Sequence, residues 1–181
     1  MDNFTYKKFQ QAKRNKDLVV MKRLYDENRN DNAIALEYAI ALSKNDRYEE
    51  AKTIFMSLIK APNKTRVFLS RTILELGKLE CSQGNIERAR TCFTSLLNLN
   101  SRDRDYAMFE LGKLEFKLGN IKEARIYFKR LFGTTSENYA KLELAKLELN
   151  QKNIALARTY FLDLINTSNS FYVNQIQSLL H

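Results

Sequence analysis

A four-residue signature recurs three times along this chain. Its copies are Leu76–Leu79, Leu111–Leu114 and Leu144–Leu147, and each is followed by an Asn-Ile pair and then by an Ala-Arg pair. Repeats of this kind stack side by side and expose an extended surface rather than enclosing a pocket. The sequence therefore favours a protein that holds a partner over one that performs chemistry.

Small residues recur in register with this signature. Ala39, Gly77, Gly112 and Ala145 are spaced by 38, 35 and 33 residues, which brackets a repeat of about 34. A second small residue follows each of them after twelve positions, and an aromatic residue follows after four more. The second set is Ala51, Ala89, Ala124 and Ala157, and the aromatics are Phe55, Phe93, Phe128 and Phe161. Small residues let two helix axes approach closely, so each period predicts a pair of antiparallel helices.

The composition supports helices throughout. The 181 residues include only five glycines and one proline, whereas Leu, Lys, Glu, Arg and Ala, which favour helices, are abundant. With 44% hydrophobic residues, the chain can bury a continuous core. We therefore expect a single all-α domain.

Residues 32–168 resemble the tetratricopeptide repeat (TPR) family. In the third unit the resemblance rests on Gly112, Gly119, Ala124 and Phe128, at the family's spacing. It implies a right-handed α-solenoid of antiparallel helix pairs, a TPR-like superhelix that serves as a non-catalytic protein–protein interaction scaffold. The expected divisions are a degenerate N-terminal helical hairpin at 1–31, repeats at 32–69, 70–104, 105–137 and 138–170, and a C-terminal helix at 171–181.

In that family the first helix of each pair lines a concave, ligand-binding face. The resemblance implies a groove made of Arg71, Leu74, Lys78, Tyr106, Phe109, Lys113, Phe116, Tyr139, Leu142 and Lys146. Lysines flanked by apolar and aromatic groups suit a peptide or protein partner with acidic and apolar side chains. A second interpretation stays open, because a glutamate precedes each lysine by three residues and the lysines can simply pair within their helices. Core packing is likewise open for Leu74, Phe109 and Leu142.

A different function follows from another feature of the repeats. Glu80, Glu115 and Glu148 stand where the tetratricopeptide family usually has an aromatic residue, and with the Gly-Asn-Ile and Ala-Arg pairs they are similar to the half-a-tetratricopeptide (HAT) pattern of RNA-processing scaffolds. The net charge of +9 and a second basic row could contact phosphates. That row is Lys52, Arg90, Arg125 and Arg158. The alternative function is therefore a HAT-like scaffold associated with nucleic acid.

The same glutamates and arginines predict ion pairs within each hairpin. If the turn lies midway between them, the two side chains face each other across the antiparallel helices. The expected pairs are Glu80 with Arg90, Glu115 with Arg125, and Glu148 with Arg158. Each would contribute at most about 1 kcal/mol if exposed.

The sequence contains few of the residue patterns that catalytic sites use. The only histidine is His181, the last residue, which argues against Ser-His or Cys-His nucleophiles and multi-histidine metal sites. Gly84-Asn85 and Gly119-Asn120 suit helical turns rather than a phosphate cradle. We expect no enzymatic activity and no cofactor or metal.

The remaining expectations concern location and the chain ends. The two cysteines suggest no disulfide framework, and neither a secretory signal nor an apolar run of about 18 residues is present, so we expect a cytoplasmic protein without a membrane span. Residues 171–180 predict a first helix without a following partner. That helix is either a solvating cap or the point where a longer chain is cut, and two chains could also pair through it as a homodimer.

Overall fold

The chain is an all-α array of helices, as the sequence predicted. The computed structural model describes residues 3–62, 64–98, 101–167 and 170–180, which form eleven α-helices and no strand. The helices are α1 (Asn3–Arg14), α2 (Leu18–Glu27), α3 (Asn32–Ser43), α4 (Tyr48–Lys60), α5 (Arg66–Ser82), α6 (Ile86–Leu96), α7 (Ser101–Lys117), α8 (Ile121–Lys129), α9 (Glu137–Asn150), α10 (Ile154–Ile165) and α11 (Ser170–Leu180). Odd-numbered helices are called first helices below, and even-numbered ones second helices.

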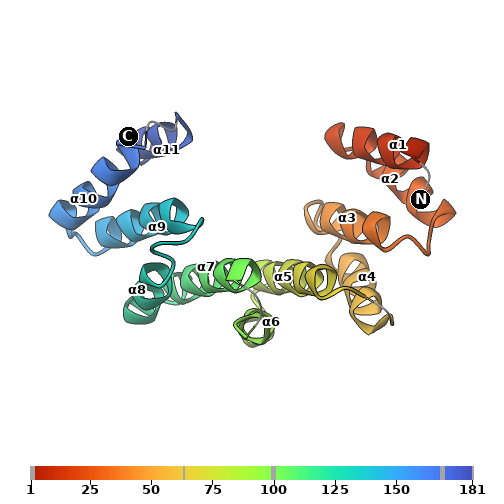
Figure 1. The fold of residues 1–181 in the computed structure, drawn as a ribbon, viewed down its shortest axis with the longest axis horizontal. Helices are drawn as coiled ribbons and strands as arrows, with labels where there is room; N and C mark the ends of the chain where they lie inside the picture. Colours follow the sequence, from red (N-terminus) through yellow and green to blue (C-terminus); the bar gives the residue numbers. More distant parts are fainter. Residues whose placement is uncertain (1–2, 63, 99–100, 168–169, 181) are drawn as a thin grey trace. The chain divides into compact units, whose positions relative to one another are not determined.

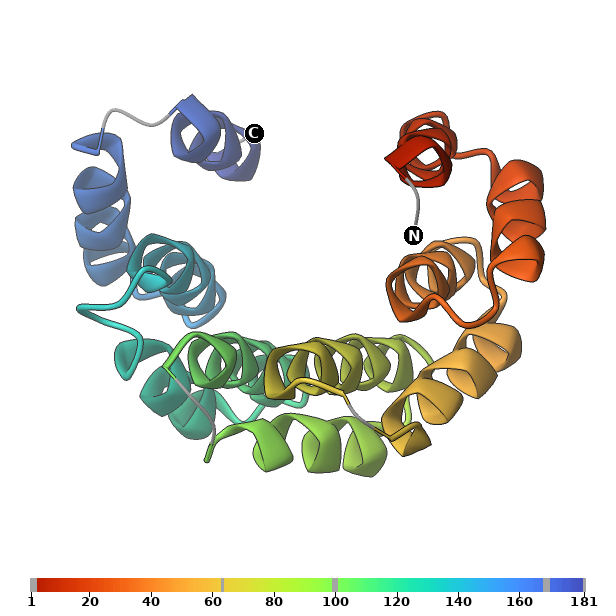
Figure 2. The ribbon, with the colours of Figure 1, turned by 45° about the vertical axis from the view of Figure 1, so that its right-hand side comes forward.

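The helices gather into two compact units, which divide within α6, between residues 92 and 93. In unit 1, α1, α3 and α5 form one layer and α2 and α4 form the other (Figures 1 and 2). In unit 2, α7 packs on α8 and α9, while α10 packs on α9 and α11. Each unit therefore presents a layer of first helices.

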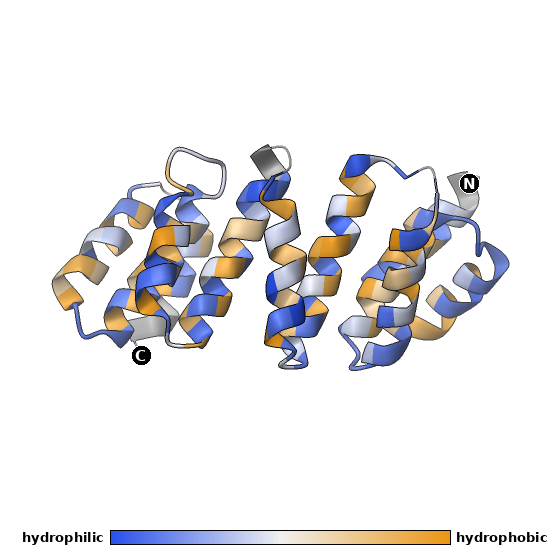
Figure 3. Cartoon of the chain, turned by 90° about the horizontal axis from the view of Figure 1, so that it is seen from below, coloured by the Kyte–Doolittle hydropathy of each residue, from blue (hydrophilic) through white to orange (hydrophobic). Residues whose placement is uncertain are grey.

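The small residues and aromatics that set the repeat register are buried. Ala39, Ala51 and Phe55 lie in the core of unit 1, and the core of unit 2 holds the residues that align with them. These are Ala124, Phe128, Ala145, Ala157 and Phe161. Figure 3 shows apolar and polar residues interleaved along the same helices, as amphipathic packing requires. The predicted register and the antiparallel helix pairs are confirmed.

Helix α3 differs from its neighbours because its own residues are apolar on almost all sides. It contacts α1, α2, α4 and α5, and it buries six residues on several sides. Its N-terminus is capped by Asp31, whose carboxylate accepts hydrogen bonds from the backbone N–H groups of Ala33 and Ile34. Glu37 is the only charged residue of this helix. A single carboxylate is thus placed in the middle of the first-helix layer of unit 1.

The turns within hairpins require a left-handed backbone at one position. Gly119 takes it between α7 and α8 with φ of 80°, and Lys152 takes it between α9 and α10 with φ of 61°. For a residue with a Cβ this conformation lowers the free energy of unfolding by about 1–2 kcal/mol. For glycine the only cost is the larger entropy of its unfolded state, about 0.5–1 kcal/mol.

We therefore expect Lys152→Gly to raise the free energy of unfolding by about 0.5–1 kcal/mol. The matched change is Gly119→Lys, which should lower it by about 1–2 kcal/mol, since the space around Gly119 is open and only the backbone is affected. Urea unfolding followed by circular dichroism measures both. Equal destabilisation by the two changes would show that the backbone conformation is not what matters at these turns.

Candidate functional site

A buried glutamate lies near the C-terminal end of α5, α7 and α9. Each of these glutamates accepts a hydrogen bond from an asparagine five residues later, in the turn that follows the helix. The pairs are Glu80 with Asn85, Glu115 with Asn120 and Glu148 with Asn153, and the distances from Asn Nδ2 to Glu Oε2 are 2.7, 2.6 and 2.8 Å. The backbone N–H of each asparagine also donates to the carbonyl of its glutamate. The recurrence of Glu and Asn five residues apart in every copy of the signature could have identified this closure from the sequence. Its role is structural.

The prediction of ion pairs within each hairpin is wrong for Glu80 and Glu148, each of which pairs with a cation of the preceding hairpin. Arg125 instead donates from Nε to Oε1 of Glu148 in the next hairpin, at 2.8 Å. Lys52 does the same with Glu80, with 2.7 Å between Nζ and Oε1. The reason is the direction of the side chain, which leaves the second helix toward the following repeat rather than toward its own first helix. These pairs join successive hairpins instead of clipping one.

Glu148 is held as a carboxylate by these neighbours. Its side chain is fully buried, which raises its pKa, but the bonds from Arg125 and Asn153 outweigh burial and place the pKa below the ordinary value of 4.5. The positive charge of Arg125 is in turn compensated by this carboxylate. This carboxylate and guanidinium therefore stabilise the stack and are occupied by each other.

That finding bears on the basic row proposed for nucleic acid. Lys52 and Arg125 form ion pairs with buried glutamates. Arg90 forms an ion pair with Glu87, with 2.9 Å between Nη1 and Oε1. Arg158 is exposed. Three of the four cations are thus paired with glutamates of this chain, two of them buried, which weighs against a phosphate-binding surface there.

Three residues of the predicted groove lie in unit 1, on α5. Arg71 is exposed and donates to Glu37 of α3. Leu74 is buried, which is the packing role that the sequence left open. Lys78 pairs with Glu75 on its own helix at 3.0 Å. Of these three residues, Arg71 makes a polar contact with another first helix of the unit.

The other seven predicted residues lie in unit 2, on α7 and α9. Lys113 and Lys146 pair with Glu110 and Glu143, at 3.1 and 2.8 Å, so intrahelical pairing is the arrangement that forms. Leu142 is buried in the core. Phe116 is half-buried against the same core. Tyr106, Phe109 and Tyr139 remain as the aromatic part of the face.

These aromatics continue across three first helices of unit 2. The Phe109 ring of α7 lies 6.3 Å from Tyr139 of α9, which in turn lies 6.4 Å from Phe171 and 6.0 Å from Tyr172 of α11. Tyr106, Tyr139 and Phe171 are about half exposed, at 48%, 50% and 48%. Lys113 extends over the Phe109 ring, with 5.5 Å from Nζ to the centroid. We call the five aromatic residues Tyr106, Phe109, Tyr139, Phe171 and Tyr172 the aromatic face.

Phe171 and Tyr172 were not among the predicted site residues. Tyr172 follows Tyr139 by 33 residues, just as Tyr139 follows Tyr106, so the period contained a signal for their place on the face. Their helix lies beyond the last complete helix pair, where the repeat alignment gives no second helix to fix its register.

Comparison with known proteins identifies the repeat. The tetratricopeptide repeat family model matches residues 74–138. This part of the chain is therefore similar to the tetratricopeptide repeat. No curated protein sequence matches the chain significantly.

Solved structures share the helical-repeat fold of this chain at low identity. PilW, a widely conserved type IV pilus biogenesis factor, aligns with a TM-score of 0.78 and 17% identity, over 98% of this chain and 81% of its own. PilF of Pseudomonas aeruginosa gives 0.69 and 15%, over 92% and 73% of the two chains. MamA of Desulfovibrio magneticus RS-1 gives 0.66 and 15%, over 92% and 94%. At these identities the likeness concerns the fold alone.

Two further observations concern membranes and metal ions. Within the described residues, every helix is too short or too polar to cross a membrane. The same residues hold no group of three or more His, Cys, Asp or Glu side chains arranged to bind a metal ion. The expected cytoplasmic location stays a prediction.

Proposed function

We propose that this chain is a non-catalytic scaffold that binds a protein or peptide partner on its first helices. The observation that carries the proposal is the aromatic face of unit 2. Tyrosine and phenylalanine rings left half in solvent by three adjacent helices are typical of interfaces, where they supply contact area at little cost in side-chain entropy. A tetratricopeptide array supports this use, because its repeats create surface rather than a reaction cavity.

The charges on this face bear on the nature of the partner. Lys113 and Lys146 are held in place by glutamates of their own helices, and Lys113 keeps 45% of its side chain in solvent. A partner carboxylate can approach such a lysine without moving it. Apolar groups of the partner would then give most of the affinity, and acidic groups would fix its orientation.

The test compares capture of partners from lysate by three forms of the chain. We expect Tyr106→Ala with Tyr139→Ala to lower recovery of a bound partner by about tenfold or more, because aromatic anchors of an interface are each worth 2 kcal/mol or more. The matched control is Ile126→Ala, which removes an equally exposed apolar side chain, 52% in solvent, from second helix α8. Circular dichroism melting verifies that all three fold. Equal recovery by the aromatic variant and the wild type would refute binding on this face.

A nucleic-acid scaffold is tested separately by fluorescence titration with a random oligonucleotide at two salt concentrations. We expect no saturable binding, since the basic row is engaged by glutamates within the fold. Tight, salt-sensitive binding that is lost with Arg158→Glu would instead support that alternative. Pairing of two chains through α11 also stays a prediction, which sedimentation at several concentrations measures.

A further inference from the structure

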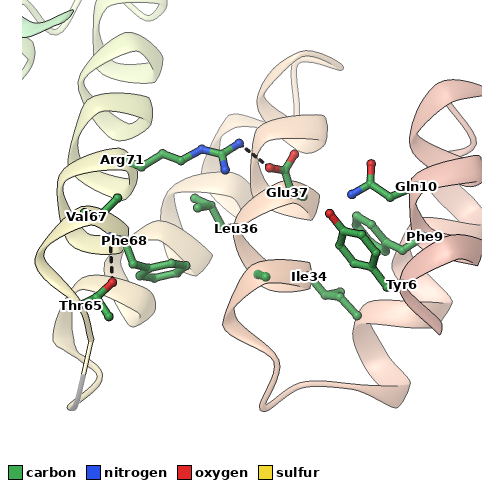
Figure 4. Close-up of a pocket in the computed structure, with 11 residues that line it drawn as sticks. Tyr6, Phe9, Gln10, Ile34, Leu36, Glu37, Thr65, Val67, Phe68 and Arg71 are labelled. Atoms are coloured by element: carbon green, nitrogen blue, oxygen red, sulfur yellow. Dashed lines mark hydrogen bonds and ion pairs between the residues drawn. The ribbon is translucent and has the colours of Figure 1, made fainter. Parts of the chain in front are cut away.

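Unit 1 contains a pocket that the sequence did not predict. It opens between α1, α3 and α5 and has a volume of about 270 Å³ (Figure 4). Its floor is formed by Phe9, Ile34 and Leu36, which are all buried. Its rim is formed by Tyr6, Val67 and Phe68, of which Tyr6 and Val67 are exposed. An apolar floor with an accessible rim suits an apolar guest.

The pocket is small for a ligand site of its own. Sites for drug-sized ligands and cofactors usually enclose about 300–1,000 Å³, and they bring several polar groups to bear on the ligand. Here the polar lining is mainly the Gln10 amide and the charged groups of Glu37 and Arg71, at one end (Figure 4). The volume therefore fits a single large side chain of a longer partner better than a free small molecule.

Three charged side chains from three helices form ion pairs at that end, where Glu37 and Arg71 line the pocket and Lys13 lies outside its lining. Glu37 of α3 accepts a hydrogen bond from Lys13 Nζ of α1 at 2.5 Å and another from Arg71 of α5. Burial raises the pKa of Glu37, but Lys13 and Arg71 together outweigh it and lower the pKa below 4.5. The carboxylate is therefore ionised and already satisfied, so it does not offer a site for a further cation.

The two cations, by contrast, remain accessible. Lys13 and Arg71 keep 42% and 54% of their side chains in solvent. A guanidinium has five N–H donors, enough for a second carboxylate beside Glu37. Helix α1 adds to the positive field, because it carries four basic residues and no acidic one. Lys64 lies over the Phe68 ring, 5.8 Å from its centroid, on the α5 side of the pocket.

We infer that this pocket binds one aromatic or large aliphatic side chain of an acidic peptide segment, whose neighbouring carboxylates Arg71 and Lys13 orient. The inference rests on the proposed function as a protein-binding scaffold and assigns it a second site, separate from the aromatic face. Charge decides between occupants: a second copy of this chain carries a net charge of +9 and would meet a basic surface. An acidic segment meets the opposite charge.

The first test uses a fluorescein-labelled peptide of glutamate and serine residues with one central phenylalanine. The comparison peptide has alanine in place of the phenylalanine, and fluorescence anisotropy measures both affinities. Since burying a phenylalanine side chain is worth about 1.5–3 kcal/mol, we expect the first peptide to bind about tenfold tighter or more. Equal affinities, or no binding of either peptide to the wild-type chain, would overturn the inference.

Changes at Val67 locate the binding site within the protein. Val67 is 62% exposed in the first turn of α5, where an aspartate is compatible with the helix because it favours the N-terminal dipole. We expect Val67→Asp to weaken the phenylalanine peptide about fivefold or more by placing a like charge at the rim. The matched variant Val67→Lys, at the same position, should bind as tightly as the wild type or more tightly. Equal weakening by both would contradict an electrostatic fit.

The failures of the two proposals can be told apart. If Tyr106→Ala with Tyr139→Ala abolishes binding of the peptide while Val67→Asp does not, the peptide occupies the aromatic face, and the pocket assignment fails while the scaffold function stands. Sedimentation of the wild type at several concentrations tests the remaining occupant. A dimer that dissociates with Val67→Asp would assign the pocket to a second copy and overturn the inference; a monomer at all concentrations supports it.

Discussion

The Phe128→Ala variant should lose about 3–5 kcal/mol of unfolding free energy, the cost of removing a fully buried phenylalanine from a packed core. The ring lies in the core of unit 2, with its centroid 6.0 Å from that of Phe109. It fills the space that Gly112 leaves on α7, because a methyl group at that glycine would lie only 2.6 Å from Cε1 of Phe128. Guanidinium unfolding followed by circular dichroism measures the loss.

A double-mutant cycle ties this cost to the glycine. Gly112→Ala alone should destabilise by about 1–3 kcal/mol, because the Phe128 ring cannot move away in a close-packed core. In a Phe128→Leu background the same change should cost less, since the smaller side chain leaves room for the methyl group. Ile126→Ala on the same helix is the surface control and should change stability by at most about 0.5 kcal/mol. Additive effects of Gly112→Ala and Phe128→Leu would show that the two side chains do not share this space.

The repeat register could be predicted because it is a local property of helices. A small residue twelve positions before another, followed by an aromatic after four more, places all three on helix faces that have to be buried. Ala124 and Phe128 are fully buried in α8, and Ala157 in α10. The spacing alone determines these burials, so the sequence sufficed for the fold class and the helix pairs.

The partners of the charged residues could not be predicted in the same way. Symmetry about the turn predicted that Glu148 faces Arg158, but the Cα–Cβ direction on the second helix decides which neighbour a side chain reaches. Arg125, 23 residues earlier, is the partner that the structure shows. A pairing between hairpins depends on how they stack, and no spacing within one hairpin contains that information.

The two candidate binding sites were accessible to sequence reasoning to different degrees. Tyr106, Phe109 and Tyr139 of the aromatic face lie on first helices whose register the repeats determine. The pocket of unit 1, however, joins Tyr6, Ile34 and Val67, which come from three helices. Tyr6 belongs to the N-terminal hairpin, which lacks the repeat signature, so nothing in the sequence aligned it with the other two.

We expect the Arg125→Met variant to lose about 2–4 kcal/mol of unfolding free energy at pH 7, the second-largest effect. Removing one partner of a buried ion pair usually costs about 3–5 kcal/mol, because the other charge stays buried without compensation. The lower range applies here since Arg125 keeps 31% of its side chain in solvent and Asn153 continues to donate to Glu148. The double variant Arg125→Met with Glu148→Gln should recover much of the loss. Its neutral amide oxygen can still accept the bond from Asn153, and no buried charge remains.

The pH dependence distinguishes the charge from mere packing. In the wild type the pKa of Glu148 lies below 4.5, so its ion pair contributes stability above about pH 4.5 that is lost as the pH falls through the folded-state pKa. Without Arg125 burial dominates, and the pKa of Glu148 should rise above the ordinary value. At neutral pH the buried, unpaired carboxylate therefore lowers the free energy of unfolding of the variant, and protonation in acid removes this destabilisation. The stability difference between wild type and Arg125→Met should therefore shrink from pH 7 to pH 4, as urea unfolding at both values measures. A difference that stays constant would mean that Arg125 contributes through the packing of its aliphatic chain and not through its charge.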